Sequence, residues 1–236
     1  MSFIIALYVG EGMVFASDSR TTYNTTTTET DGKIEIEHGV HITDSTYKTF
    51  LTPANVAIST CGDASIEDKP IASYIESFIS EHRNDNVEDI KDAILPYFKN
   101  LSANLNSTFF VGGYLINENG TYSQKLYRII TSKGSIEERD TNTQGAIWGG
   151  ETDVMSRMIT TLYVKQDDNY IEHAEYPILW NYLTLQDAVD FAQYAVKTTI
   201  DTMRFQKRVK TVGGPIDILV LKPDEARWIS RKELHG

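Results

Sequence analysis

The sequence has a single cysteine, few basic residues and no long apolar run. The lone thiol, Cys61, cannot form an internal disulfide, which favours a reducing compartment. Lysine and arginine number 22 against 33 acidic residues, so the formal net charge is −11, and the largest basic cluster is RFQKRVK at 204–210. Phosphate contacts need a concentrated Lys/Arg surface, so we expect no nucleic-acid partner.

Membrane and export signals are also missing. No apolar stretch approaches the roughly 18 residues that a membrane-spanning helix needs, and no Lys/Arg-rich region precedes an apolar run at the N-terminus. We therefore expect neither a membrane span nor a signal peptide. Together with the single cysteine, this predicts a cytoplasmic protein.

What the sequence does contain is an ordinary globular composition, with 41% hydrophobic and 23% charged residues. We find no internal repeat and no boundary between domains, so a single domain over 1–236 is expected. Apolar, β-branched runs predict strands at 3–9, 13–18, 47–51, 55–62, 107–116, 122–131, 134–140 and 214–221. Apolar stripes with helical spacing predict helices at 63–82, 87–105, 151–164 and 184–204.

Several local features of these elements are expected as well. Asp63 is placed to cap the first helix, and Pro96 to kink or break the second. The threonine-rich segment 21–46 is interpreted as a polar excursion with a short strand at 33–37, and 165–181 as a linker. Helices come in pairs between blocks of strands, which disfavours a parallel doubly wound sheet. The order predicts an α+β fold of two antiparallel sheets flanked by helix pairs, a four-layer αββα sandwich.

A group of polar residues and glycines surrounds the first two predicted hairpins. A hydroxyl residue directly precedes the first apolar strand, an Asp-Ser-Arg run follows the second strand, a lysine begins the next hairpin and a glycine ends it. These residues are Ser2, Asp18, Ser19, Arg20, Lys48 and Gly62. In this combination the sequence resembles a bacterial relative of the proteasome β-subunit group within the N-terminal-nucleophile (Ntn) hydrolases. The resemblance implies the same fold over the whole chain and hydrolysis of peptide or small amide bonds.

The resemblance also implies a role for each residue. Once Met1 is removed, as expected before a small residue, Ser2 carries both the nucleophilic hydroxyl and the α-amine that takes its proton. The α-amine has a reference pKa of about 7.7–8.0, and the nearby ammonium of Lys48 lowers it. Asp18 holds Lys48 charged and oriented, and the N–H of Gly62 stabilises the oxyanion. Ser19 and Arg20 support the site, and no cofactor is expected.

The chain departs from the family pattern at two places. The segment AIWGG at 146–150 puts Gly149 where the family has a serine that supports the active site. In KRVKTVGG at 207–214, Val209 and Val212 stand where the family has an aspartate and a serine beside the nucleophile. Thr211 is a candidate substitute if this loop shifts by one residue.

Most of these residues also have a purely structural interpretation. Ser2 is a residue favoured after the initiator methionine, Asp18 and Lys48 can form a buried ion pair, and Gly62 can serve a helix entry. Cys61 is interpreted as a small core residue. Glu37, His38 and His41 are interpreted as part of a solvated loop and not as a metal site. Residues 111–114 are interpreted as a strand bend and not as a nucleotide-binding loop.

Two functions from different classes therefore stay open. The first is a peptidase or amidase that works through Ser2. The second is a catalytically decayed relative that acts as a structural or binding oligomer, which the glycine at 149 and the two valines favour. The family generally assembles into rings or helical stacks, so we expect a homo-oligomer, while the sequence identifies neither its symmetry nor an ATP-dependent unfoldase partner.

Overall fold

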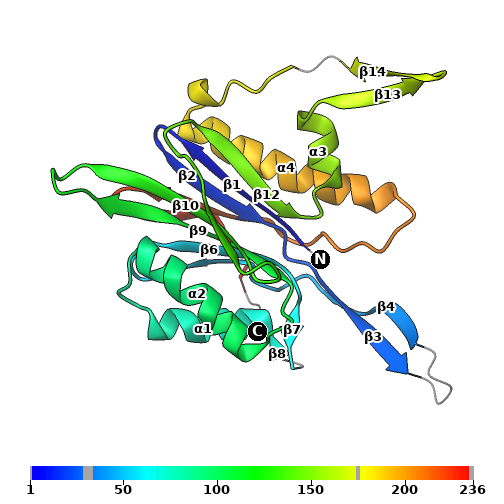
Figure 1. The fold of residues 1–236 in the computed structure, drawn as a ribbon, viewed down its shortest axis with the longest axis horizontal. Helices are drawn as coiled ribbons and strands as arrows, with labels where there is room; N and C mark the ends of the chain where they lie inside the picture. Colours follow the sequence, from blue (N-terminus) through cyan, green and yellow to red (C-terminus); the bar gives the residue numbers. More distant parts are fainter. Residues whose placement is uncertain (1, 29–33, 68, 174–175, 234–236) are drawn as a thin grey trace.

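The computed structural model describes residues 2–28, 34–67, 69–173 and 176–233, and it is built around two five-stranded antiparallel sheets (Figure 1). The first sheet has the order β12 (Gly145–Gly150), β1 (Phe3–Val9), β2 (Gly12–Ser17), β15 (Asp217–Lys222) and β16 (Glu225–Ser230). The second has the order β11 (Ser135–Glu138), β10 (Tyr122–Ile130), β9 (Ser107–Ile116), β6 (Ala57–Gly62) and β5 (Thr49–Leu51).

Helices cover the outer faces of both sheets. The first sheet packs against α4 (Leu185–Phe205) and α3 (Asp153–Ile159), and the second against α1 (Ile71–Glu81) and α2 (Val87–Leu101) (Figure 1). A third apolar core lies between the two sheets, with Ile4 and Phe15 from one and Ala57 and Phe110 from the other. A mixed architecture of antiparallel sheets and helices is therefore confirmed.

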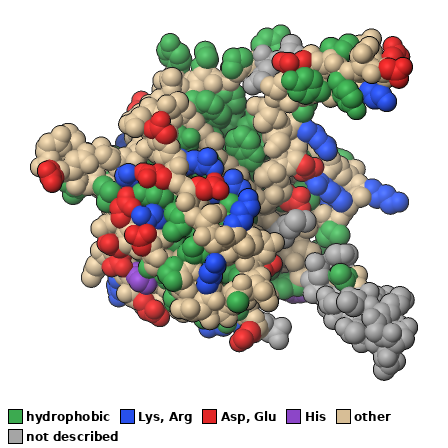
Figure 2. Space-filling view, viewed as in Figure 1, with side chains coloured by type: hydrophobic (Ala, Val, Ile, Leu, Met, Phe, Trp, Pro, Cys, Tyr) green, Lys and Arg blue, Asp and Glu red, His purple; other side chains and the backbone are tan. Residues whose placement is uncertain are grey.

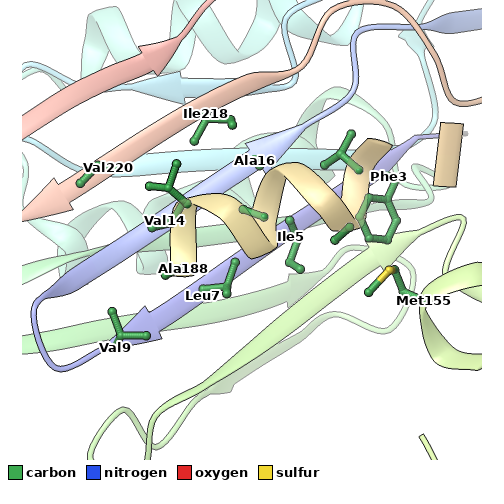
Figure 3. Packing of buried hydrophobic residues seen from close by; sticks show 14 of the residues in the cluster. Phe3, Ile5, Leu7, Val9, Val14, Ala16, Met155, Ala188, Ile218 and Val220 are labelled. Atoms are coloured by element: carbon green, nitrogen blue, oxygen red, sulfur yellow. The ribbon is translucent and has the colours of Figure 1, made fainter. Parts of the chain in front are cut away.

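Strand β1 shows why the first apolar run has no polar gap. Phe3, Ile5 and Leu7 point toward α4 (Figure 3), while Ile4 and Ala6 point into the core between the sheets. All five side chains are fully buried. Since side chains alternate between the faces of a strand, a strand covered on both sides must be apolar at every position. Burial of each large apolar side chain contributes about 1.5–3 kcal/mol, which fixes β1 firmly in the sheet.

Two helices begin where their sequence predicts. The side chain of Thr184 accepts a hydrogen bond from the N–H of Asp187, whose carboxylate accepts from the N–H of Thr184, so α4 starts with a capping box. Asn86 and Asp89 form the same arrangement at α2. A kink or a break was expected at Pro96, and the break is wrong, because α2 continues through it to Leu101. Pro96 is exposed, so water can hydrate the backbone oxygen that loses its helical partner.

The first helix is shorter than predicted. It begins at Ile71 rather than near residue 63, after a small hairpin of β7 (Ser65–Ile66) and β8 (Lys69–Pro70). Asp63 does not cap it, because its carboxylate accepts a hydrogen bond from the N–H of Asn106 at 2.7 Å. The expectation for 63–82 is therefore wrong over its first eight residues.

Two hairpins project from the body (Figure 1), and the sequence predicted only part of one of them, the short strand at 33–37, which lies largely within β4 (Ile34–Thr43). β3 (Thr21–Thr28) pairs with β4 (Ile34–Thr43) in place of the expected excursion, and residues 29–33 lie outside the described chain. β13 (Leu162–Gln166) pairs with β14 (Asn169–His173), so the predicted helix 151–164 ends at Ile159 and the predicted linker is partly strand. A short 3-10 turn (Trp180–Tyr182) follows.

The final strand β16, after the predicted closing strand, was also missed by the sequence interpretation. It lies at the edge of the first sheet and pairs with β15. Among the helices of the described chain, none has both the length and the apolar character required to cross a membrane.

Candidate functional site

Ser2 directly precedes β1, and Gly150 and Glu151 pack closely around its backbone carbonyl. The oxygen of Ser2 accepts a hydrogen bond from the N–H of Glu151 at 2.8 Å. Gly150 has a φ of +88°, and a Cβ atom there would collide with the carbonyl of Ser2, so glycine is required at this position. Ser2 is 7% exposed, which places it at the margin of the core between the sheets.

Asp18, at the end of β2, is fully buried and accepts four hydrogen bonds. Its Oδ1 accepts from the N–H of Phe3 at 2.9 Å and from Nζ of Lys48 at 2.7 Å. Its Oδ2 accepts from the N–H of Arg20 at 3.1 Å and of Gly213 at 3.0 Å. The carboxylate thus joins the backbone next to Ser2, the lysine and a distant loop of the chain.

Lys48 is 3% exposed and reaches its partners from the segment before β5. Its ammonium donates to Asp18 and also to the backbone oxygen of Arg20. Burial lowers the pKa of Lys48, because the charged form loses its hydration, and the neighbouring Asp18 carboxylate opposes this shift by stabilising the ammonium. The structure therefore holds a buried cation within reach of the start of the chain.

Ser2 and Lys48 line the same small cavity, together with Tyr47 and Gly62. Its volume is about 20 Å³, which is room for roughly one water molecule. A larger groove of about 550 Å³ adjoins it, since residues 61–64 line both. The two hollows together form a small cavity beside Ser2 and an open groove that leads to it.

Gly62 stands at the junction of the cavity and the groove. Its φ is +120°, a conformation that side chains rarely adopt, and an added Cβ would collide with the backbone oxygen of Asn106. A glycine is therefore needed here for backbone geometry, whatever its role in chemistry. The interpretation as a helix entry does not hold, because α1 begins nine residues later.

Ser19 and Arg20 connect the site to other segments. The hydroxyl of Ser19 donates to the backbone oxygen of Pro215 at 2.6 Å. The guanidinium of Arg20 binds both carboxylate oxygens of Asp44, at 2.6 and 2.7 Å, and raises the stability of the ionised carboxylate, which lowers the pKa of Asp44. Both residues hold the Asp18 segment in place and neither lines the cavity beside Ser2.

The structure places the three residues that depart from the resembled pattern, Gly149, Val209 and Val212, in different surroundings. A Cβ atom at Gly149 would lie 3.1 Å from Sγ of Cys61 and 3.2 Å from Phe110, so the position faces a tightly packed core. Val212 is buried in the core beneath α4, whereas Val209 is 39% exposed. Cys61 is buried and its pKa is raised to about 12 by loss of hydration, which fits its interpretation as a core residue.

Glu151 is a residue of this site that the sequence interpretation missed. Its side chain, 12% exposed, accepts a hydrogen bond from the hydroxyl of Thr211 at 2.8 Å and forms an ion pair with Arg208 at 3.4 Å. The one sequence signal for it is its position directly after the two glycines at 149 and 150. Thr211, the candidate substitute for the missing polar residues, acts here as the partner of Glu151.

The other weighed residues lie away from Ser2. The ring of His41 packs against Tyr23 with their centroids 5.8 Å apart, and the side chain of His38 is outside the described atoms. In the part of the chain that the structure describes, no cluster of three or more His, Cys, Asp or Glu side chains could hold a metal ion. Residues 111–114 lie within β9, where Gly112 packs against Phe15.

Comparisons with known proteins agree in fold alone. No protein-family model and no curated protein sequence matches this chain. Among solved structures it is similar to a Gly-1 mutant of Anbu from Hyphomicrobium sp. strain MC1, with a TM-score of 0.59 and 17% sequence identity. The match covers 98% of this chain and 87% of that chain. The chain therefore shares the fold of Anbu over nearly its whole length.

Proposed function

We propose that this protein is a proteasome-like Ntn hydrolase that cleaves peptide or small amide bonds through Ser2 after removal of Met1. The shared fold with Anbu, a proteasome-like bacterial protein, supports the family. The run from Ser2 to Arg20, with Lys48 and Gly62, supports the site assignment within it. The proposal includes a single domain with a four-layer αββα architecture, to which the three apolar cores correspond.

One observation carries the proposal: the buried Asp18–Lys48 pair adjoins the cavity that Ser2 lines. A buried ion pair is costly, because both charges lose their hydration, and it is weak support for stability alone. Beside an N-terminal amine the same cation has a chemical use. It disfavours the ammonium form of the amine and so keeps a neutral base available near pH 7.

In the first half of the reaction, the neutral α-amine of Ser2 takes the proton of its own hydroxyl while Oγ attacks the carbonyl carbon of the substrate. The resulting oxyanion accepts a hydrogen bond from the N–H of Gly62, a contribution of about 3 kcal/mol in other enzymes. The ammonium then gives its proton to the leaving nitrogen as the C–N bond breaks. An ester between Ser2 and the acyl part of the substrate remains.

In the second half, water attacks the ester carbonyl and the amine of Ser2 accepts a proton from that water. The tetrahedral intermediate collapses, the C–Oγ bond breaks, and the proton returns to the serine oxygen. The small cavity, with room for about one water molecule, lies where such a water would be needed. The groove of about 550 Å³ receives the substrate.

The test is covalent labelling followed by mass spectrometry. Untagged protein expressed in the cytoplasm is expected to lack the mass of one methionine. A peptide epoxyketone, whose two electrophilic carbons need an adjacent amine and hydroxyl, is expected to add its whole mass to the peptide that begins with Ser2. Ser2→Ala and Lys48→Met should abolish the label, and retention of Met1 in the native protein would end the proposal.

A matched control separates chemistry from folding. Thr60 lines the same cavity as Lys48 and its hydroxyl makes no hydrogen bond within the described chain, so Thr60→Val changes the cavity wall without touching the ion pair. We expect this variant to keep the label at Ser2. Loss of label in Lys48→Met, measured at a temperature where circular dichroism shows this variant and Thr60→Val both folded, assigns the loss to the missing cation.

The second candidate is a non-catalytic protein that works as a homo-oligomer. Apolar side chains are exposed on the β13–β14 hairpin and on the segment that follows it, and Figure 2 shows hydrophobic side chains on this projecting hairpin. Tyr170 is 71% exposed and Tyr182 81%. Self-association through this surface fits either candidate, and we include it in the proposal. Steady amide hydrolysis that Ser2→Ala abolishes would exclude the non-catalytic protein.

Sedimentation velocity tests the assembly itself. Tyr170→Glu should lower the sedimentation coefficient if the hairpin is covered in the oligomer, while Tyr122→Glu, on the exposed end of β10, serves as the control. An unchanged coefficient in both variants contradicts an interface at the hairpin.

A further inference from the structure

The proposed mechanism gives no part to Glu151, whose backbone contacts Ser2. Glu151 donates its backbone N–H to the oxygen of Ser2 at 2.8 Å, and its side chain is nearly covered. The hydroxyl of Thr211 donates to this carboxylate at 2.8 Å, and the guanidinium of Arg208 lies 3.4 Å from its other oxygen. Because Thr211 and Arg208 both bind this largely buried carboxylate, the position of Glu151 is fixed.

The loop that holds Glu151 also holds Asp18. Two residues after Thr211, the N–H of Gly213 donates to Oδ2 of Asp18 at 3.0 Å. Asp18 in turn accepts from the N–H of Phe3 at 2.9 Å, directly after Ser2 in the chain. The loop at 211–213 therefore supports the beginning of β1 at two points. It binds Glu151, which holds the carbonyl of Ser2, and Asp18, which holds the amide of Phe3.

The backbone conformation at Gly150 explains why Ser2 needs the contact with Glu151. Gly150 adopts a φ of +88° immediately before Glu151, so the chain turns away from the sheet at this point. The regular pairing of β12 with β1 ends at Gly150 and Phe3, one residue short of Ser2. Beyond that pair, the hydrogen bond from Glu151 ties Ser2 to the body of the protein.

We propose that Glu151 is a positioning residue for Ser2, held in place by Thr211 and Arg208. Its fixed backbone N–H orients the Ser2 carbonyl, and this sets the direction in which the hydroxyl and the amine of Ser2 face the cavity. The inference rests on the proposed function. Reaction rates depend steeply on such alignment, so release of Glu151 should slow attack by Ser2 about 10- to 100-fold.

The experiment compares substitutions that break one contact with conservative ones that keep it. Thr211→Val removes the hydroxyl at nearly constant volume, and Thr211→Ser retains it. Glu151→Ala removes the acceptor, and Glu151→Gln retains an oxygen that can accept from Thr211. Asp153→Asn, which disturbs the outer ion pair of Arg208 at 3.3 Å, is the control.

The labelling rate of Ser2 is measured at several concentrations of the peptide epoxyketone. The curve gives two separate values, the first-order rate at saturation and the probe concentration at half saturation. We expect Thr211→Val and Glu151→Ala to lower the rate about 10- to 100-fold with the half-saturating concentration unchanged, and Thr211→Ser, Glu151→Gln and Asp153→Asn to stay within about 3-fold of wild type. A purely structural role would lower the thermal midpoint of Thr211→Val and leave its labelling rate unchanged, which would overturn the inference.

Hydrogen exchange distinguishes this failure from failure of the proposed function. In Thr211→Val, peptides that contain the N–H of Glu151, the donor to Ser2, should exchange faster than in wild type, while peptides from α4 should exchange at the same rate. If wild-type protein takes no label, the proposed function fails. Hydrogen exchange in Thr211→Val then still tests whether Thr211 supports the hydrogen bond between Glu151 and Ser2. If wild type is labelled and Thr211→Val changes neither labelling nor exchange, the positioning role alone is wrong.

Discussion

Replacing Asp18 with asparagine tests the central ion pair of the site. The carboxylate accepts four hydrogen bonds, two at each oxygen. Three of them are buried and the one from the N–H of Arg20 is partly buried. An asparagine keeps one oxygen and points an NH₂ group at the two donors on the other side. In either orientation of the amide, two donors face another donor, and the charge that balances Lys48 is gone.

The structure gives the size of the effect. Removal of one partner from a buried ion pair costs about 3–5 kcal/mol, because the remaining charge is left without compensation. Natural domains are stable by about 5–15 kcal/mol, so Asp18→Asn should lose a large share of the free energy of unfolding. The asparagine also leaves Lys48 without the anion that favours its ammonium, so the pKa of Lys48 falls further and the cation beside Ser2 weakens.

Urea unfolding followed by circular dichroism measures this loss, with labelling of Ser2 measured at concentrations where the variant stays folded. The double variant Asp18→Asn/Lys48→Met removes the uncompensated ammonium as well. Its destabilisation should be smaller than the sum of the two single changes by about 1–3 kcal/mol. A loss below about 1 kcal/mol for Asp18→Asn, or strict additivity in the double variant, would refute the reasoning.

Three further predictions concern the neighbourhood of the site. Gly62→Ala should cost about 1–3 kcal/mol or more in urea unfolding, since it adds a backbone collision to a strained φ, whereas Gly120→Ala, with open space around it, should cost about 1 kcal/mol. At pH 7, Asp44→Asn should lose less than about 1 kcal/mol of stability, because its pair with Arg20 is partly exposed. Since the folded-state pKa of Asp44 is lowered, this difference is present above the ordinary pKa near 4 and should disappear as pH falls below it; a difference that persists in acid contradicts the assignment. With its pKa near 12, Cys61 should react with iodoacetamide at pH 8.5 about 1,000-fold more slowly in folded protein than in urea, and equal rates would show that the thiol is accessible.

The central strands could be predicted because their burial leaves a clear pattern. β1 and β2 lie between two apolar cores, so their sequences are apolar throughout, and the short glycine turn at 10–12 joins them. Helix α4 was predicted to within a residue at each end, because a capping threonine and a regular apolar stripe mark it. In these elements, local preference and tertiary packing favour the same structure.

The projecting hairpins could not be predicted in the same way. Every residue of β13 and β14 is exposed, so neither strand shows the alternation that a half-buried strand would have. At the end of the predicted helix 151–164, Leu162 belongs to this hairpin and not to α3, which ends at Ile159. The threonine-rich strand β3 pairs with β4, and its polar sequence lacks the apolar alternation by which a strand is predicted.

The residues of the candidate site differ in how clearly the sequence indicates that they lie together. The Asp-Ser-Arg run after β2 and the lysine before β5 are visible in the sequence, and the structure brings Asp18 and Lys48 to 2.7 Å. Glu151 and Thr211 are 60 residues apart, and both were outside the sequence interpretation as a pair. Their contact follows from the loop after α4, whose path depends on the packing of the whole first sheet.

The same long-range pairing has a consequence for biosynthesis. β15 pairs with β2 in the first sheet, and Gly213 and Pro215 bind Asp18 and Ser19 across 195 and 196 residues of sequence. On the ribosome, the first twenty residues emerge long before those partners exist. A nascent chain that has not yet reached residue 213 would therefore lack the contacts that hold Asp18 and Ser19 in place.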